Sequence, residues 1–476
     1  MANGGRSESS SAGLDAMERQ DIERDTAHLA GSKYLIVEKI RQVASVSFAV
    51  QIASTGLGLV SSVLLTHWLG PRNFGLYSYV LAVTGIAGVL GGLGFSTLLV
   101  RETAAWKATS NWGFVKGLLF QSSGLTFMAS IAFGFAVWVV GLRLGHLNQI
   151  AGFRTDLFLA IVLMIFSVQL SIITSALQGL NKVVASLIPG SLGIPLFFLI
   201  CISGLHWGKG VISVTNILSC QIGIALAVIA IQILQFFKSV PPQWFKCSSR
   251  IRFPDWLYKA FPFLINGMLT TINLRTDVFL LGVMKGPGAA GVYNAATRGA
   301  LLLVLALSAI ATASQPTIAS LHAKGETTRL RQVITMTSRF GFLVSVVGCV
   351  IIVAFRNIFL GALFGSAFTY GATALAILSV ARAVNAATGS LGPFLAMTNQ
   401  AKTLSLALGT EAISNVGLNY FLIPRMGMNG SAVATGGSMV LMNVVLSIWV
   451  YKRSGYDVSF LGLHQRNAVP SGGLNA

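Results

Sequence analysis

Twelve long apolar stretches follow one another along most of this 476-residue chain, and no other feature constrains its fold as strongly. Hydrocarbon offers the backbone no hydrogen-bond partner, so a crossing segment forms a helix of about 20 mostly apolar residues. The stretches occupy 43–65, 76–100, 114–141, 157–178, 184–205, 211–236, 257–283, 292–315, 332–355, 370–395, 403–423 and 431–451. They predict an all-α integral membrane protein with twelve transmembrane helices.

The composition agrees with a lipid environment. Charged residues make up 10% of the chain, whereas a soluble domain carries about 25%. The net charge is +19, but the basic residues alternate with apolar stretches, which argues against nucleic-acid binding. The four cysteines have no metal or redox spacing, so we expect small buried hydrophobic side chains. No metal site and no cofactor are expected.

Lysine and arginine are distributed unevenly between the two sets of loops. Most lie in the set that includes both ends of the chain. Because basic residues favour the cytoplasmic side, both termini are expected to be cytoplasmic. The predicted domains are a partly disordered cytoplasmic N-terminal tail (1–42), a six-helix lobe (43–236), a cytoplasmic linker (237–256), a second six-helix lobe (257–452) and a cytoplasmic tail (453–476).

The sequence of one short loop occurs twice in similar form. GPRNFGLY (70–77) joins the first two spans, and GPGAAGVY (286–293) joins the seventh and eighth. A second echo places Asn181 after span four and Asn399 after span ten. Repeats with an even number of spans are related by an axis along the membrane normal, so two similar bundles could rock around a central cavity. The loops themselves are expected to be structural, since glycine tolerates the turn and proline fixes it.

Three segments resemble the polysaccharide-exporter branch of the MOP superfamily, the Wzx-type oligosaccharide or O-antigen flippases. They are LGPRNFGLYSYVLAVTGIAGVLGGLGFSTLLVRE (69–102), RTDVFLLGVMKGPGAAGVYNAATR (275–298) and NYFLIPRMGMNGSAVAT (419–435). The resemblance implies a MATE-like fold with two pseudo-symmetric six-helix bundles around a central cavity. Ser431 stands where the family usually has alanine, and we expect this departure to leave transport untouched.

The same resemblance implies a cargo and partners. The cargo would be a polyprenyl-diphosphate-linked oligosaccharide, the repeat unit of an O-antigen, other lipopolysaccharide or exopolysaccharide. It would move from the cytoplasmic to the outer leaflet of the bacterial inner membrane. Membrane lipids, a polysaccharide polymerase and chain-length machinery would be partners.

Six ionisable residues lie inside spans of the second half, where such groups usually face a cavity or one another. They are Arg275, Arg298, Arg339, Arg382, Asp277 and Glu411. The arginines are predicted to line a cavity for anionic cargo, because the guanidinium fork suits phosphate. Internal salt bridges are the alternative, with Asp277 facing Arg298, and Arg339 could instead reach the inner interface. The two acids are either partners of arginine or sites that couple transport to a proton or sodium gradient.

The first half offers other polar groups, and three prolines offer hinges. Gln51, Lys116, Gln121 and Gln169 either line the cavity for sugars or hold helices together. Pro189, Pro195 and Pro262 are predicted hinge positions, with tolerated kinks as the alternative.

Three classes of function compete. A flippase suits the arginines best. An ion-coupled multidrug or other small-solute exporter of the same architecture is the alternative, but an exporter of cations would favour acids in its cavity. A membrane enzyme would need acids or bases paired for proton transfer, and no histidine lies deep in a span. We therefore expect no enzymatic activity.

Overall fold

The computed structural model describes residues 8–143, 152–209, 212–304, 327–388 and 401–454, with side chains from Val46 onward and a few further side chains omitted. Nearly all of these residues are helical, and the described ranges contain no strand. The first half contains α1 (Glu8–Gly92), α2 (Phe95–Ala108), α3 (Trp112–Arg143), α5 (Phe153–Gly179), α6 (Val183–Leu187), η1 (Ile188–Gly193), α7 (Ile194–Lys209), α8 (Val214–Ser239) and α9 (Pro242–Lys246). The second half contains α10 (Phe253–Lys285), a helix over 287–304, α12 (Thr327–Ala354), α13 (Arg356–Phe364), η2 (Ser366–Gly371), α14 (Ala372–Ala387), α16 (Ala401–Met426) and α17 (Met428–Ser454).

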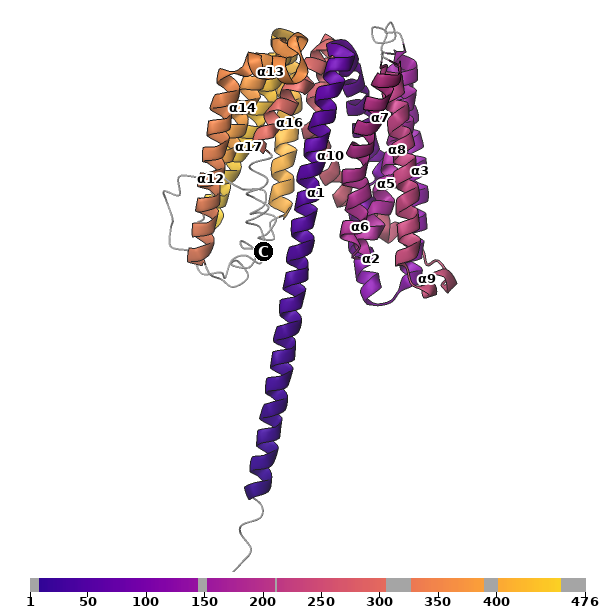
Figure 1. Cartoon of the computed structure of the whole chain (residues 1–476), viewed down its shortest axis with the longest axis vertical. Coiled ribbons are helices and arrows are strands. Elements are labelled where there is room, and N and C mark those ends of the chain that lie inside the picture. The colour runs from indigo at the N-terminus through magenta and orange to yellow at the C-terminus, as the bar shows by residue number, and fades with distance from the viewer. Residues whose placement is uncertain (1–7, 144–151, 210–211, 305–326, 389–400, 455–476) are drawn as a thin grey trace, which may run out of the picture.

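The helices form two groups (Figure 1). One group contains α3, α5, α7 and α8, and the other contains α12, α14, α16 and α17. Helices α1 and α10 lie between the groups and pack against each other. This is the two-lobe arrangement that the repeat predicts.

The two copies of the repeated loop adopt the same backbone conformation. Gly70 has φ 69° and ψ 176°, and Gly286 has φ 85° and ψ 168°. Each precedes a proline, which begins the next helical segment. A positive φ of this kind favours glycine, so both turns depend on the residue that the repeat shares. Of the second echo, only Asn181, which has φ 59°, lies within the described residues, whereas Asn399 lies outside them.

The first two spans differ from their expected limits. The backbone is helical from Glu8, within the tail for which we expected partial disorder, and α1 extends far beyond both groups in Figure 1. After the turn at Gly70 the helix continues to Gly92. It then breaks at Leu93 and Gly94, which have φ values of 50° and 74°. Two consecutive left-handed residues end the helix, and α2 begins at Phe95.

Helix α10 begins on the first lobe and ends on the second. Near its start, Trp256 and Ala260 pack with Phe95 of α2 in one apolar cluster. Close by, Lys259 Nζ lies 3.3 Å from Glu102 Oε1. Further along, Asn273 donates from Nδ2 to the carbonyl oxygen of Leu408 on α16. The physical division between the lobes therefore falls inside α10.

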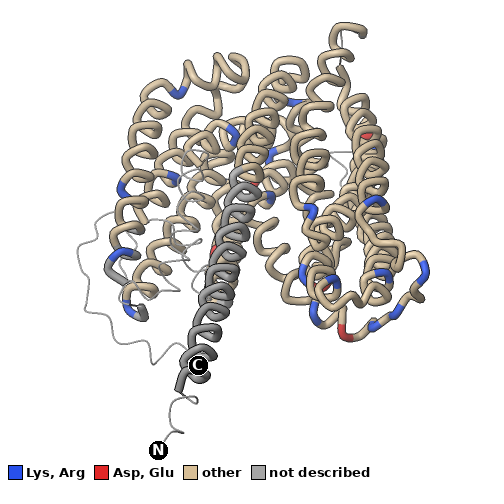
Figure 2. The backbone as a smooth tube through the Cα atoms, turned by 60° about the horizontal axis from the view of Figure 1, so that its bottom comes forward, with Lys and Arg blue, Asp and Glu red and all other residues tan. Residues whose placement is uncertain are grey.

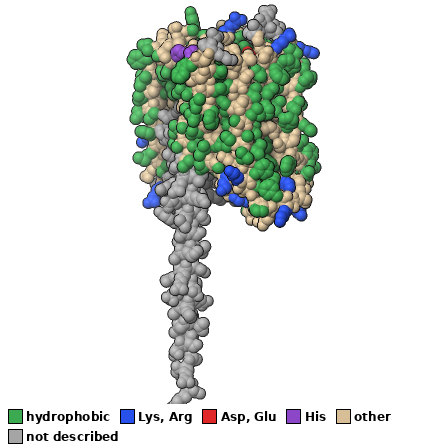
Figure 3. Space-filling view, turned by 45° about the vertical axis from the view of Figure 1, so that its right-hand side comes forward, with side chains coloured by type: hydrophobic (Ala, Val, Ile, Leu, Met, Phe, Trp, Pro, Cys, Tyr) green, Lys and Arg blue, Asp and Glu red, His purple; other side chains and the backbone are tan. Residues whose placement is uncertain are grey.

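The outer surface is that of a membrane protein. Eight helical segments among the described residues are long and apolar enough to span a bilayer, and the first, Val46–Ala108, contains the first two predicted spans. Helices α10 and α16 and the helix over 287–304 lie at the other three. Hydrophobic side chains cover the middle of the surface in Figure 3, with lysine and arginine toward both ends. Few charged residues lie within the bundle (Figure 2). The protein is a multi-pass membrane protein.

Two of the four cysteines are paired, and for these two the expectation of unpaired buried side chains was wrong. A disulfide joins Cys201 of α7 to Cys220 of α8, with 6.8 Å between the Cα atoms. The two helices are neighbours in an antiparallel hairpin, which brings the cysteines side by side. Their spacing along the chain matches no known motif, so only the hairpin reveals the pair.

Candidate functional site

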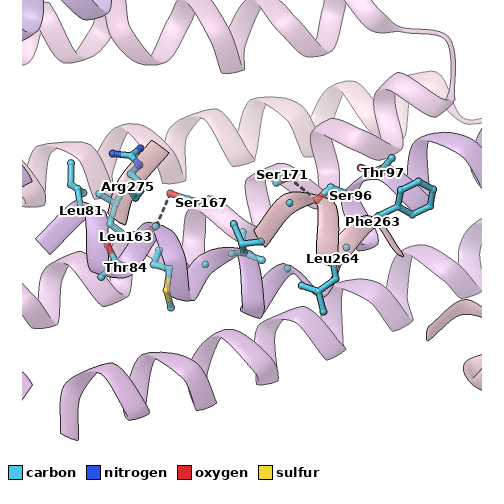
Figure 4. Close-up of a pocket in the computed structure, with 18 of the residues that line it drawn as sticks. Leu81, Thr84, Ser96, Thr97, Leu163, Ser167, Ser171, Phe263, Leu264 and Arg275 are labelled. Atoms are coloured by element: carbon cyan, nitrogen blue, oxygen red, sulfur yellow. Dashed lines mark hydrogen bonds between the residues drawn. The ribbon is translucent and has the colours of Figure 1, made fainter. Parts of the chain in front are cut away.

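A cavity of about 440 Å³ lies between α1, α2, α5 and α10. Small and hydroxyl-bearing residues dominate its polar wall (Figure 4). Arg275 lies at one end with Thr84 and Ser167, and Ser96 and Phe263 lie at the other end. Because α10 rises 1.5 Å per residue, the twelve residues from Phe263 to Arg275 span about 18 Å. The cavity is therefore an elongated space with one cationic end.

Arg275 enters this space because α10 crosses between the lobes. Its side chain is exposed to the cavity. A Cβ atom on Gly85 of α1 would lie 3.7 Å from Arg275 Nε, so the guanidinium lies along the first lobe. A larger residue at position 85 would compete with it for space.

Arg298, on the helix over 287–304, belongs to the same cationic region. It interacts electrostatically with Arg275 and with Tyr77 of α1. The Tyr77 hydroxyl oxygen accepts a hydrogen bond of 2.8 Å from Gln221 Nε2 of α8. Within the part of the chain that the structure describes, neither arginine has a hydrogen-bond or ion-pair partner. Two such cations between the lobes favour an anionic ligand.

The other two predicted arginines lie elsewhere, so the four do not line one cavity. Arg382 on α14 donates to Met439 Sδ at 3.4 Å, and its electrostatic neighbours are Tyr293, Glu411 and Asp277. It therefore belongs to the interior of the second lobe. Arg339 is exposed on α12, which packs mainly against α14 and lies away from the first lobe.

Asp277 is buried in a network of neutral donors and not beside Arg298. Its Oδ2 accepts hydrogen bonds from the hydroxyls of Thr435 at 2.6 Å and Tyr293 at 3.0 Å. Its Oδ1 accepts from Asn419 Nδ2 at 2.9 Å. The suggested ion pair with Arg298 is therefore wrong. The reason is that α16 and α17 supply enough donors to hold the carboxylate within its own lobe.

Three more polar contacts complete this network, which joins four helices. Asn419 Nδ2 also contacts the side-chain oxygen of Asn415 at 3.2 Å, and Asn415 Nδ2 donates to Thr435 Oγ1 at 3.3 Å. Ser431 donates to Asn419 Oδ1 at 2.7 Å. Ser431 therefore belongs to this network, because its hydroxyl fixes the orientation of the Asn419 amide. That the serine leaves transport untouched stays a prediction.

Glu411 lies on a second cavity, of about 310 Å³, between α16 and α17. Its Oε2 accepts a hydrogen bond of 3.3 Å from Asn273 Nδ2 of α10. The rest of this cavity is mostly apolar, with residues such as Leu406 and Trp449. Glu411 and Arg382 interact electrostatically, but no ion pair within 4 Å joins them.

Of the four polar residues predicted in the first lobe, Gln169 and Lys116 join helical segments to their neighbours, and Gln51 and Gln121 do not. Gln169 of α5 bonds to Ser123 Oγ of α3 at 2.8 Å. Lys116 donates to the carbonyl oxygen of Cys247 at 3.1 Å, which ties α3 to the linker. Gln51 is exposed on α1, and Gln121 Oε1 is buried without a hydrogen-bond partner among the described residues. None of the four lines either cavity.

The predicted hinge prolines differ in their surroundings. Regular α-helix stops at Leu187, just before Pro189, and resumes at Ile194 after the π-helical segment η1. Pro195 lies in the first turn of α7. Helix α10 continues through Pro262 without a break. Movement at these positions stays a prediction.

The two copies of the repeated loop meet each other between the lobes. A Cβ atom on Gly75 would collide with the carbonyl oxygen of Pro287, and one on Gly291 would collide with that of Pro71. Asn294 Nδ2 donates to Ser78 Oγ at 2.7 Å across the same contact. These two residues are 216 positions apart, which is the repeat distance, so the contact lies on the pseudo-symmetry axis.

Sequence reasoning missed several residues that the structure places at these sites. Tyr77 and Tyr293 are the last residues of the two copies of the repeated loop. Their equivalent positions in the repeat could have identified them from the sequence. Asn415 carried no signal without the neighbouring helices, and Thr435 appeared only as the last residue of the segment 419–435. No three histidine, cysteine, aspartate or glutamate side chains gather as a metal site in the described ranges.

Comparisons with known proteins agree with this architecture. Residues 40–322 match the family described as Polysaccharide biosynthesis protein. The probable low-salt glycan biosynthesis flippase Agl15 of Haloferax volcanii is 27% identical over 169 residues, which cover 36% of this chain and 36% of that relative. The match thus spans about a third of the relative's length.

Solved structures show the same fold. An inward-facing multidrug resistance MATE transporter of the MOP superfamily has a TM-score of 0.67 at 14% identity, covering 86% of this chain and 98% of its own. The lipid II flippase MurJ in an inward closed conformation has a TM-score of 0.66 at 16% identity, covering 84% and 87%. An outward-facing MATE transporter has a TM-score of 0.56 at 13% identity, covering 86% and 95%.

Proposed function

The chain belongs to the Polysaccharide biosynthesis protein family, and from this we propose that it is a flippase for a lipid-linked oligosaccharide. The cargo is a polyprenyl-diphosphate-linked repeat unit of a surface polysaccharide. It moves from the cytoplasmic to the outer leaflet of the bacterial inner membrane, with both termini of the protein cytoplasmic. The proteins that resemble it include two flippases and a multidrug transporter, which supports transport and not catalysis.

The observation that carries this proposal is the pair Arg275 and Arg298 between the lobes. Both guanidinium groups lack a partner among the described residues. A diphosphate carries charge and acceptors only, and guanidinium groups bind such groups with paired hydrogen bonds. Arg339 and Arg382 play no part in this binding.

Alternating access between the two lobes would move the cargo. The higher TM-score against the inward-facing transporter than against the outward-facing one supports an inward-facing state. In that state the contact between Gly75 and Gly291 closes the opposite side. Opening to the outside requires these two loops to separate.

A coupling ion would act at Asp277. The carboxylate is buried and bonded to groups on three other helical segments, through Tyr293, Asn419 and Thr435. Binding of a proton or a sodium ion to this carboxylate would change all of these bonds together. The site can therefore link ion binding to the packing of the second lobe. A polymerase and chain-length machinery would then receive the exported unit.

Replacement of Arg298 in cells that lack the native gene tests the flippase proposal. Arg298→Ala is expected to give normal protein, lost surface polymer and an accumulated pool of lipid-linked oligosaccharide on the cytoplasmic leaflet. Arg298→Lys should restore part of the export, because lysine keeps the charge but not the fork. Arg425→Ala is the matched control, because this exposed arginine bonds to its own helix through the carbonyl oxygen of Phe421.

Two outcomes would contradict the proposal. Deletion of the gene without accumulation of lipid-linked oligosaccharide would show that the cargo is something else. Full export by a stable Arg298→Ala protein would remove Arg298 from the site.

A further inference from the structure

Two hydroxyls beside Arg275 already donate their protons within their own helices. Thr84 donates its proton to the carbonyl oxygen of Val80, and Ser167 donates to that of Leu163, each at 2.7 Å. A serine or threonine hydroxyl has one proton and two lone pairs. With the proton bonded inside the helix, as Figure 4 shows for Ser167, the oxygen lone pairs remain for a ligand in the cavity.

The far end of the cavity has a similar preference. Ser96 Oγ and Ser171 Oγ lie 2.9 Å apart and share one hydrogen bond. The pair therefore presents several lone pairs but one remaining proton. Phe263 and Leu264 complete this end with apolar surface.

These acceptors separate the two chemical parts of a lipid-linked sugar. A diphosphate has only acceptors and gains little from an oxygen that also accepts, whereas the donor-only guanidinium of Arg275 suits it. Sugar hydroxyls bring donors and suit Thr84 and Ser167. The cavity is thus selective along its length.

Glycines on one face of α1 keep the wall free of side chains. A glycine in the middle of a helix costs about 0.5–1 kcal/mol relative to alanine, so Gly88 calls for a reason, whereas Gly92 is the last residue of α1. A Cβ atom on Gly92 would meet nothing within 4 Å, and one on Gly88 would lie 3.2 Å from Met164 Cγ and 3.8 Å from Val168 Cγ2. Both glycines line the cavity. Packing does not require glycine at position 92, and at position 88 a methyl group would need Met164 to shift slightly. It does require Gly91, whose Cβ would lie 2.6 Å from Ser130 Oγ.

We propose that this cavity is a sugar subsite, in which the diphosphate lies at Arg275 and the sugar rings extend along the hydroxyl and glycine wall toward Ser96. This inference rests on the proposed function. It makes Gly88 and Gly92 specificity-determining residues, because the space that they leave limits how many sugars the cavity accepts. Cargo with a single sugar stays near Arg275 and does not reach Gly92.

Transport of two probes in proteoliposomes tests the inference. The probes are a polyprenyl diphosphate carrying one sugar and one carrying an oligosaccharide. The readout is the fraction of sugar reached by an impermeant oxidant. Gly92→Leu fills the far part of the cavity, and Gly124→Leu on α3 is the control, because its Cβ also meets nothing within 4 Å but lies outside the cavity.

Gly92→Leu should slow the oligosaccharide probe by about tenfold or more and leave the single-sugar probe near the wild-type rate. One extra methylene in a hydrophobic pocket shifts discrimination about 10- to 200-fold, and leucine adds more than one to the wall. Equal rates for the two probes in Gly92→Leu, whether both normal or both reduced, would overturn the sugar subsite. A wild-type protein that moves neither probe would instead overturn the flippase proposal and, with it, this inference.

Discussion

Tyr77 and Tyr293 occupy the same place in the two halves of the molecule, yet their surroundings are chemically opposite. Tyr77 bonds to the neutral Gln221 and lies near Arg275 and Arg298. Tyr293 bonds to the carboxylate of Asp277. The tyrosine of the first lobe thus lies near two cations, whereas the tyrosine of the second lobe bonds to a carboxylate.

The comparison separates what the repeat preserves from what it leaves free. Gly70 and Gly286 keep the same backbone turn, because each must adopt a positive φ before a proline. The residue 216 positions before Asp277 is Ser61, whose hydroxyl only bonds to Leu57 of its own helix. The repeat therefore gives both lobes the same backbone turn. The carboxylate of Asp277, in contrast, has a serine at the equivalent position of the first lobe. We infer that ion coupling belongs to the second lobe and cargo recognition to the surface that faces the first.

The largest effect is expected from Asp277→Asn. An amide keeps the size of the side chain but removes the charge that would bind a coupling ion, so transport driven by a proton or sodium gradient should be lost entirely. Ser61→Ala, at the equivalent place in the first lobe, should transport normally. The measurement is uptake of lipid-linked oligosaccharide by proteoliposomes under each gradient in turn. Gradient-driven transport by a folded Asp277→Asn protein would contradict the assignment of the two lobes.

A second large effect is expected where the two loops touch. Gly291→Ala places a methyl group against the carbonyl oxygen of Pro71, and overpacking of this kind costs about 1–3 kcal/mol. Since the cost falls on the closed contact alone, the equilibrium should shift toward the outward-open state by about 5- to 150-fold. Hydrogen exchange over residues 71–77 should become faster in the variant.

Gly288→Ala is the control for this shift. Its Cβ would meet nothing within 4 Å in the same loop, so exchange should stay at the wild-type rate. Unchanged exchange in Gly291→Ala would show that the two loops do not separate during transport.

A smaller difference is expected between the two tyrosines. Tyr293→Phe removes a hydrogen bond to a carboxylate, worth about 1.5–3 kcal/mol, and Tyr77→Phe removes a neutral one, worth about 0.5–1.5 kcal/mol. Thermal unfolding in detergent should therefore show the larger loss for Tyr293→Phe. Equal losses would mean that the Asp277 network is no stronger than the contact with Gln221.

The sequence predicts the fold well because lipid imposes the strongest constraint. Apolar length alone places helices at every predicted span, and the shared Gly-Pro turn indicates two similar lobes. The break at Leu93 and the start of α10 on the first lobe escape prediction. Both depend on which helix packs against which, and hydropathy carries no such information.

The candidate site is only half predictable for the same reason. Arg275 and Arg298 stand out because charge is rare inside a span, and the structure places Arg275 in the cavity and Arg298 within electrostatic range of it. Arg382 stands out equally but turns toward Met439. A cation inside a span is costly to bury, so the sequence indicates that it needs a favourable environment. The neighbouring helices determine whether that environment is a cavity or the interior of a lobe. The side chains that donate hydrogen bonds to Asp277 are uncharged, so a hydropathy profile does not identify them.

The smallest effect concerns the hydrogen bond on the pseudo-symmetry axis. Asn294→Ala and Ser78→Ala should each weaken the contact between the loops, because a single neutral hydrogen bond contributes about 0.5–1.5 kcal/mol. The double variant should lose little more than either single one, since both changes break the same bond. A double-mutant cycle on hydrogen exchange over residues 71–77 measures this coupling. Additive effects would mean that the two side chains act separately, and the closed contact would then depend on Gly75 and Gly291 alone.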